Sequence, residues 1–250
     1  MSKKTLIFVL ISHFVYSQKL EIGAGAGPTY YKGDLQPTFR VFNPSIATNL
    51  FVRYNISKVF SIKGNASFGM VSGNDKRSGN ALNKYRGLKF NNTLWDYYGQ
   101  VEYNFLNFRT HNGRYEHSWT PYLFGGFGNY QHLKRKFDSR GNITISNKIA
   151  GPDPILPFGV GYKKILNGKW NFGVEFSTRV LLRKKNSDLF DGFGFSPDHP
   201  DPQSLYTAFD SGDKNFALLK YPNTKEKDKY FMVSFSVSYL FYKVHCPPGR

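Results

Sequence analysis

Two carboxylates, Glu102 and Glu175, belong to the residue type that general acid–base catalysis most often uses. A hydrolase would also need a serine and a histidine that converge with an acid at one rim of the fold. His132 lies at a suitable position in the chain, but no paired serine and carboxylate accompany it. We therefore predict that both glutamates have a packing role, that the chain is not an enzyme, and that it has no catalytic residues.

Metal and nucleotide sites are not predicted either. The histidines share no metal-ligand spacing with a carboxylate or cysteine; they are His13, His111, His117, His132, His199 and His245. Six aspartates cluster late in the chain without the spacing of a calcium loop; they are Asp188, Asp191, Asp198, Asp201, Asp210 and Asp213. Glycines 23, 25 and 27 lack the dinucleotide-binding spacing, and Pro28 prevents a following helix. We expect no cofactor and no metal, although ligand or calcium binding by the long loops stays open.

The elements that must position these side chains are strands with alternating faces. Aromatic residues make up 18% of the chain and 24 residues are glycine, a composition typical of strands and tight turns. Alternation predicts eight strands, over residues 19–31, 45–54, 60–72, 92–105, 121–130, 155–165, 170–182 and 230–241. In the fifth strand both faces mix glycine with aromatic residues, so its facing is not settled. Asn167-Gly168 predicts a tight hairpin between strands six and seven.

The last strand shows the alternation most clearly. One face is wholly apolar and is predicted to contact lipid; it consists of Phe231, Val233, Phe235, Val237, Tyr239 and Phe241. The opposite faces of the strands carry charges of both signs in similar number; they are Glu21, Arg53, Lys63, Asp96, Glu102, Lys163, Glu175 and Arg179. Buried charges persist when they are paired and hydrogen-bonded. We predict a charge network that fills the interior of a small barrel and leaves no open pore.

The connections alternate in length along the chain. Short or moderate ones cover residues 55–59, 106–120 and 166–169, whereas long ones cover 32–44, 73–91, 131–154 and 183–229. Short periplasmic turns and long external loops are typical of outer-membrane barrels. A soluble sandwich gives no reason to sort its loops in this way. The predicted fold is therefore all-β, an eight-stranded antiparallel up-and-down transmembrane β-barrel.

The first residues predict export. Lys3 and Lys4 precede an apolar stretch over residues 6–15, and Ser17 is small enough for cleavage after it. We expect a signal peptide over 1–17, a barrel over 18–242, a short periplasmic tail over 243–250, and a location in the bacterial outer membrane. The net charge of +17 suggests contact with anionic lipid headgroups or an acidic protein rather than nucleic acid. The single Cys246 cannot form an internal disulfide, and the oligomeric state stays open.

The second short turn is basic. It carries Arg109, His111, Arg114 and His117, on the side expected to face the periplasm. One interpretation is a solvated turn near anionic headgroups. The more specific interpretation is a docking surface for a periplasmic partner. The identity of that partner cannot be obtained from these residues.

Several short stretches together resemble a known family. They are Tyr30-Tyr31-Lys32-Gly33-Asp34-Leu35, Asn43-Pro44-Ser45-Ile46, Val52-Arg53-Tyr54-Asn55-Ile56, Val101-Glu102-Tyr103-Asn104-Phe105, Thr120-Pro121-Tyr122-Leu123-Phe124-Gly125-Gly126 and Trp170-Asn171-Phe172-Gly173-Val174-Glu175-Phe176. In this order they resemble the PorG-like outer-membrane barrels of Bacteroidota. After strand seven the family often has Thr-Asp-Tyr-Leu-Asp-Asp, and here residues 187–192 read Ser-Asp-Leu-Phe-Asp-Gly, a partial match.

The resemblance implies an outer-membrane barrel that accompanies the type IX secretion system and contacts a PorK–PorN-like periplasmic ring. It implies no catalytic residues. We therefore expect an accessory or anchoring component of a secretion system, with outer-membrane lipids as its surroundings. The alternative is a structural or adhesive barrel whose long loops bind external ligands.

Overall fold

The structure is a computed structural model of the 250-residue chain, and it describes residues 20–32, 44–74, 89–108, 116–137, 143–182 and 229–241. The predicted signal peptide, the tail and most of the long connections lie outside these residues. Within them, no helix has both the length and the apolar character that crossing a membrane would require.

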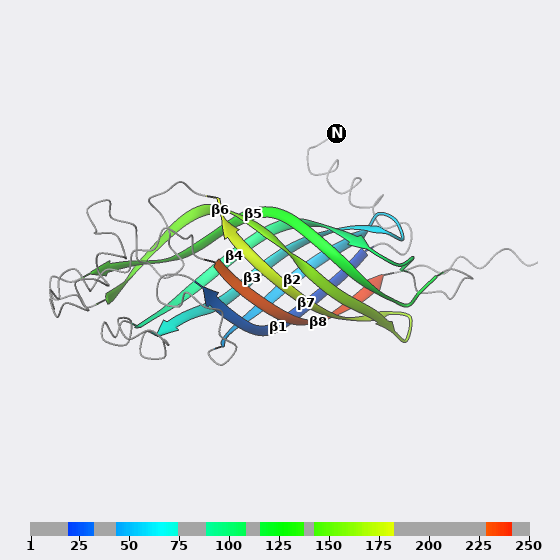
Figure 1. The fold of residues 1–250 in the computed structure, drawn as a ribbon, viewed down its shortest axis with the longest axis horizontal. Coiled ribbons are helices and arrows are strands. Elements are labelled where there is room, and N and C mark those ends of the chain that lie inside the picture. Colours follow the sequence, from blue (N-terminus) through cyan, green and yellow to red (C-terminus); the bar gives the residue numbers. More distant parts are fainter. Residues whose placement is uncertain are drawn as a thin grey trace, which may run out of the picture.

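Eight strands form one closed barrel in the described part of the chain, and each pairs antiparallel with its neighbours in sequence (Figure 1). They are β1 (Leu20–Lys32), β2 (Ser45–Asn55), β3 (Phe60–Asn74), β4 (Lys89–Asn104), β5 (Trp119–Phe137), β6 (Ile143–Leu166), β7 (Trp170–Leu181) and β8 (Lys229–Phe241). β1 closes the barrel against β8. The predicted eight-stranded, antiparallel, up-and-down barrel is confirmed, and six of its strands end within three residues of their predicted limits.

Alternating side chains make the two surfaces of the barrel different. Along β2, Leu50 and Val52 point outward, whereas Phe51 and Arg53 are buried. The same period holds along β3 and β7. Between β6 and β7, Asn167 and Gly168 both have positive φ, at 51° and 73°, in the three-residue turn 167–169 that joins Leu166 to Trp170. The predicted Asn-Gly hairpin is thus confirmed.

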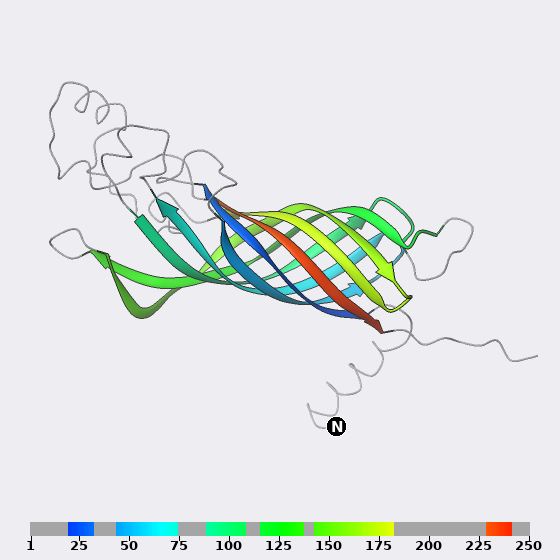
Figure 2. The same cartoon turned by 90° about the horizontal axis from the view of Figure 1, so that it is seen from below.

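The connection between β5 and β6 differs from the prediction. Residues 131–137 and 143–154, expected to be loop, continue the two strands as a hairpin that extends beyond the ends of the other strands (Figure 2). β4 stops pairing with β5 at His132, so that farther out β5 pairs only with β6. The sequence carried a signal that the prediction did not use, because isoleucines at 143, 145 and 149 alternate with polar residues at 144, 146 and 148.

The facing of β5 is now defined. Tyr122, Phe124 and Tyr130 are buried inside, whereas Leu123 and Phe127 lie on the outer surface. Both faces carry aromatic residues and glycines, so hydrophobicity alone could not separate them. The outer face is marked by the exposed side chains, with Phe127 at 59% exposure.

Candidate functional site

The barrel interior contains all eight charged residues that were placed on the polar strand faces. Each is at most 5% exposed, although four are cationic and four anionic. Transfer of such groups from water is costly unless partners and hydrogen bonds compensate. Their pairing therefore decides whether the interior is stable.

Glu102 on β4 lies at the centre of the network. Its carboxylate is 3.0 Å from Arg53 Nε on β2 and 2.9 Å from Lys163 Nζ on β6. The Arg53 Nη1 atom is also 2.8 Å from Glu21 on β1. One glutamate thus compensates two cations that are separated from it by 49 and 61 residues in the chain. The network ties opposite walls of the barrel together.

The two flanking carboxylates each accept more than one hydrogen bond. Glu21 also accepts from Asn55 at 2.7 Å, and from Asn171 and Ser238 at 3.0 Å each. Glu175 on β7 accepts from Lys63 Nζ at 2.6 Å and from the Tyr122 hydroxyl at 2.7 Å. Each of these glutamates thus links its own strand to at least two others.

Aromatic rings cover the cations on their remaining sides. Lys63 Nζ lies 4.4 Å from the centre of the Phe51 ring, and Lys163 Nζ lies 4.8 Å from Tyr122 and 5.0 Å from Phe108. Cation–π contacts of this kind gain strength when they are desolvated. Phe108 belongs to the second short turn, so this turn contributes a buried side chain below Lys163.

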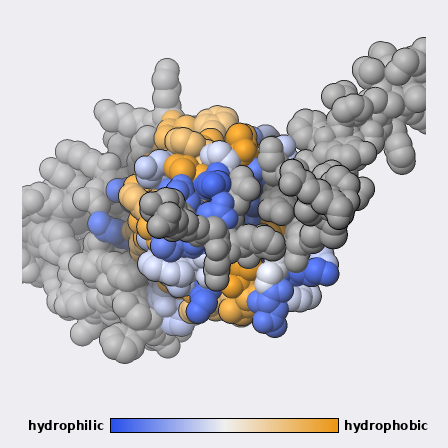
Figure 3. All heavy atoms as spheres, turned by 90° about the vertical axis from the view of Figure 1, so that its right-hand side faces the viewer, coloured by the Kyte–Doolittle hydropathy of each residue, from blue (hydrophilic) through white to orange (hydrophobic). Residues whose placement is uncertain are grey.

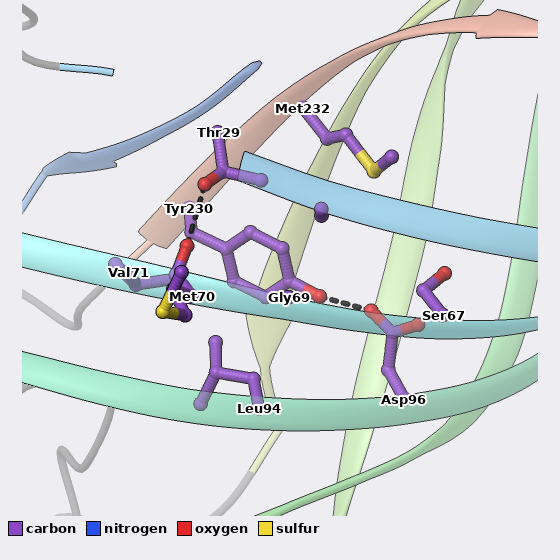
Figure 4. A pocket seen from close by; sticks show the side chains of 10 residues that line it. Thr29, Ser67, Gly69, Met70, Val71, Leu94, Asp96, Tyr230 and Met232 are labelled. Carbon is purple, nitrogen blue, oxygen red and sulfur yellow. Dashed lines mark hydrogen bonds between the residues drawn. The ribbon is translucent and has the colours of Figure 1, made fainter. Parts of the chain in front are cut away.

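A second cluster surrounds Arg179 nearer the loop end of the barrel. Its Nε lies 3.2 Å from Asp96, and its Nη2 lies 3.1 Å from the Tyr98 hydroxyl. The Tyr230 hydroxyl donates to the same Asp96 carboxylate (Figure 4). The Arg179 guanidinium also lies 4.9 Å from the centre of the Tyr230 ring. Asp96 therefore joins β4, β7 and β8 from inside.

Little free space remains beside these clusters. The cavity next to Asp96 and Tyr230 has a volume of about 10 Å³, enough for about one water molecule. Toward the loop end an apolar cluster fills the interior; it consists of Tyr31, Val71, Leu94, Tyr130, Ile155, Leu181 and Tyr230. Within the described ranges, no group of three or more His, Cys, Asp or Glu side chains is placed to hold a metal ion. The interior has the arrangement of a packed core.

A glycine opposite Tyr122 gives a test of this packing. A Cβ at Gly161 would overlap the Tyr122 ring, which pairs across the β5–β6 ladder. Gly161→Ala should displace the ring and weaken its hydrogen bond to Glu175. We expect a loss of about 1–3 kcal/mol in the free energy of unfolding, measured by urea titration in detergent or vesicles.

Gly125→Ala is the matched control. Its added Cβ meets no atom within 4 Å on the outer surface. We expect it to stay within about 0.5 kcal/mol of the parent, as surface substitutions do. Equal losses in the two variants would refute a specific role for the Tyr122–Gly161 contact.

The outer surface is apolar over a broad belt. Large hydrophobic side chains exposed there include Leu50, Val52, Val101, Leu123 and Val237. Seen from the turn end, hydrophobic residues lie at the edge and hydrophilic residues gather between them (Figure 3). Soluble proteins rarely expose a contiguous apolar surface of this extent. The six outward residues of β8 all belong to this belt.

Aromatic pairs border the belt at both ends. On the turn side, Trp170 lies 5.3 Å from Tyr239, and Trp119 lies 5.9 Å from Tyr162. On the loop side, Phe68 lies 5.6 Å from Trp95, and Phe176 lies 6.0 Å from Phe231. Phe231 and Phe241 are about ten residues apart on β8, which corresponds to about 25 Å for a tilted strand. This matches the apolar band and aromatic girdles of outer-membrane barrels.

The basic turn is described only in part. Arg109, His111 and Arg114 lie outside the described residues. His117 is exposed, and its ring lies 6.1 Å from that of Trp119. The base of the turn is held to the first turn, because Lys58 pairs with Glu116 at 2.9 Å and its carbonyl accepts from Phe108 N at 3.2 Å. The turn is therefore fixed at its base on the barrel end.

Sequence reasoning missed several interior partners. Tyr122, Tyr230 and Phe108 contact the charge network, although no role was predicted for them. For Tyr230, the period of two counted from Met232, on the predicted inner face of the last strand, could have indicated an inward side chain. Tyr122 could not be placed in this way, because the sequence did not settle the facing of β5. Phe108 follows the end of β4 in an irregular turn, so no periodic signal marks it.

Comparison with solved structures shows similarity to small outer-membrane barrels. Neisserial surface protein A aligns with 8% identity over 88% of this chain and 96% of its own, with a TM-score of 0.46. Ail from Yersinia pestis, in complex with the heparin analogue sucrose octasulfate, aligns with 9% identity over 89% and 98%, also at 0.46. OprG from Pseudomonas aeruginosa aligns with 11% identity over 91% and 98%, at 0.39.

Comparison with curated protein sequences gave no match. A family model does match, and it covers residues 2–248, nearly the whole chain. The chain belongs to the family described as a domain of unknown function, DUF6089.

Proposed function

We propose that this chain spans a bacterial outer membrane as a non-enzymatic β-barrel. The observation that carries the proposal is the distribution of polarity, with paired charges inside and an apolar belt between two aromatic borders outside. In water this arrangement would expose the belt. In a bilayer the belt would contact lipid. The backbone N–H and C=O groups of every strand would pair with those of a neighbouring strand around the closed barrel.

The short turns then face the periplasm and the long connections face outside, as in other barrels of this type. We further propose that the barrel is an accessory of a type IX secretion system and anchors a PorK–PorN-like periplasmic ring. The resemblance to PorG-like barrels supports this role. So does the second turn, which is basic in sequence and fixed at its base by the Lys58–Glu116 pair.

Alanine at both Arg109 and Arg114 should weaken this association. Each substitution removes a positive charge from the turn nominated for docking. We expect at least a tenfold drop in the amount of periplasmic ring protein recovered with the barrel, measured by affinity purification from crosslinked native membranes. The parent chain must recover that protein for the comparison to apply.

The control is Lys164→Ala with Lys169→Ala, which removes two exposed cations from the same end of the barrel. Its recovery should equal that of the parent. Unchanged recovery in the arginine variant would reject the turn as the docking site, and no ring protein in the parent sample would reject the secretion role.

The alternative is a structural or adhesive barrel that binds external ligands. The β5–β6 hairpin favours it, because this hairpin extends beyond the barrel on the loop side (Figure 2). Crosslinking from the external side, with no periplasmic ring protein recovered, would support this second function.

A further inference from the structure

Two buried polar atoms on neighbouring strands face the same small cavity inside the barrel. Ser67 on β3 and Asp96 on β4 are directly opposite each other in the strand ladder, and both side chains point inward (Figure 4). Neither Ser67 Oγ nor Asp96 Oδ1 has a hydrogen-bond partner in the described part of the chain. Buried polar atoms seldom stay without a partner, because the cost of removing them from water is then not recovered.

The other oxygen of Asp96 is bound by the protein. Asp96 Oδ2 lies 3.2 Å from Arg179 Nε and accepts a hydrogen bond from the Tyr230 hydroxyl. These donors come from β7 and β8, whereas Oδ1 lies on the side of Ser67 and β3 (Figure 4). Half of this buried carboxylate is therefore satisfied by the chain, and the other half requires a donor from another source.

The cavity has the size and the lining that one water molecule needs. Its volume is about 10 Å³, and both Ser67 and Asp96 line it. Much of the remaining wall is apolar and includes Ala47, Leu94 and Met232. A wholly apolar cavity of this size would stay dry. A carboxylate oxygen and a hydroxyl on one wall provide the two polar partners that hold a buried water.

We propose that this cavity binds a single water molecule that bridges Asp96 and Ser67. The water donates a hydrogen bond to Asp96 Oδ1 and accepts one from the Ser67 hydroxyl. A metal cation fits the site less well, because its one carboxylate is already compensated by the Arg179 guanidinium. Asp96 joins β4, β7 and β8 through its direct contacts, and the water adds β3 to this set. The inference concerns the barrel interior and does not depend on the secretion role.

A crystal structure of the full chain, at a resolution that shows ordered water, tests the site directly. We expect a density peak about 2.6–3.2 Å from both Asp96 Oδ1 and Ser67 Oγ. Crystals grown in rubidium chloride should show no anomalous peak at this position, since the occupant is water. A dry cavity, a direct hydrogen bond between Ser67 and Asp96, or a rubidium peak would each overturn the proposal. The last result would assign the cavity to a monovalent cation instead.

A measurement on the folded protein in detergent micelles tests the bridge by the sign of a stability change. If Ser67 binds the water, Ser67→Ala removes a hydrogen bond and leaves Asp96 Oδ1 with a less well-held donor. We then expect the equilibrium constant for unfolding in urea to rise roughly fivefold. If the hydroxyl has no partner, its removal should leave that constant unchanged or lower it, because a buried unsatisfied group is lost.

Ser61→Ala is the matched control on the same strand. Ser61 is also buried, and its hydroxyl donates directly to Asn55 Oδ1 at 2.7 Å. Its removal should raise the unfolding constant by a similar factor, which calibrates the loss of one buried hydroxyl hydrogen bond. An unfolding constant that rises in Ser61→Ala and stays at the parental value or falls in Ser67→Ala would contradict the water bridge.

Discussion

Replacing Glu102 with glutamine should lower the free energy of unfolding by about 3–5 kcal/mol, the range found when one partner of a buried ion pair is removed. Glu102 is fully buried and compensates Arg53 and Lys163 together. Arg53 keeps Glu21 in the variant. Lys163, however, has no other carboxylate within salt-bridge distance among the described residues. Equilibrium unfolding in urea, followed by tryptophan fluorescence in lipid vesicles, measures the loss.

Two further variants identify the cause of that loss. Glu116→Gln removes the same charge from the Lys58 pair at the turn end, where the Lys58 side chain is 40% exposed. It should cost about 0–1 kcal/mol, as exposed pairs do. Adding Lys163→Met to Glu102→Gln removes the uncompensated cation and should recover at least half of the loss. A double variant as unstable as the single one would contradict the electrostatic explanation.

Alternation predicted the barrel part of the fold because each strand there has one side in the interior and the other on the outer surface. Along β2 and β7 every second residue contacts the interior, and the others form the outer surface. Beyond the loop-side aromatic border this contrast ends. Residues 131–137 mix polar and apolar types without a regular period, and the alternation that does exist, in residues 143–149, stands apart from the predicted sixth strand.

The sequence also identified which charges are interior but not which of them pair. Strand faces follow from a local period of two, so Glu21, Arg53 and Glu102 could each be placed inside. Their pairing depends on the stagger of neighbouring strands around the closed barrel, which is a property of the whole sheet. The contact between Lys163 and Phe108 is harder still, since it involves a residue outside regular structure.

The distribution of polarity is therefore the reverse of that in a soluble protein, with paired charges inside the barrel and apolar side chains outside. The interior is stabilised by complementary charge and hydrogen bonds, with Glu21 alone accepting from Arg53, Asn55, Asn171 and Ser238. On the exterior, Leu50 and the other outward apolar side chains are exposed, because no other described part of the chain packs against them. Whether lipid surrounds this exterior is the point on which the proposed function depends.

Leu50→Arg tests that point directly. Leu50 is 67% exposed in the middle of β2, facing outward between Ala24 and Ala66. On the surface of a soluble protein, this substitution would change stability by no more than about 0.5 kcal/mol. At the middle of a bilayer the same arginine should cost about 2–4 kcal/mol. Urea unfolding of the vesicle-inserted protein gives the difference.

Ile56→Arg is the matched control, because Ile56 is an equally large aliphatic residue, 46% exposed, in the turn just after β2. Arginine near the interface should cost about 0–1 kcal/mol, since its guanidinium can reach water and headgroups. The proposed membrane location thus predicts a dependence on depth within a single strand and turn. Equal and small effects at both positions would mean that the apolar belt is covered by something other than lipid.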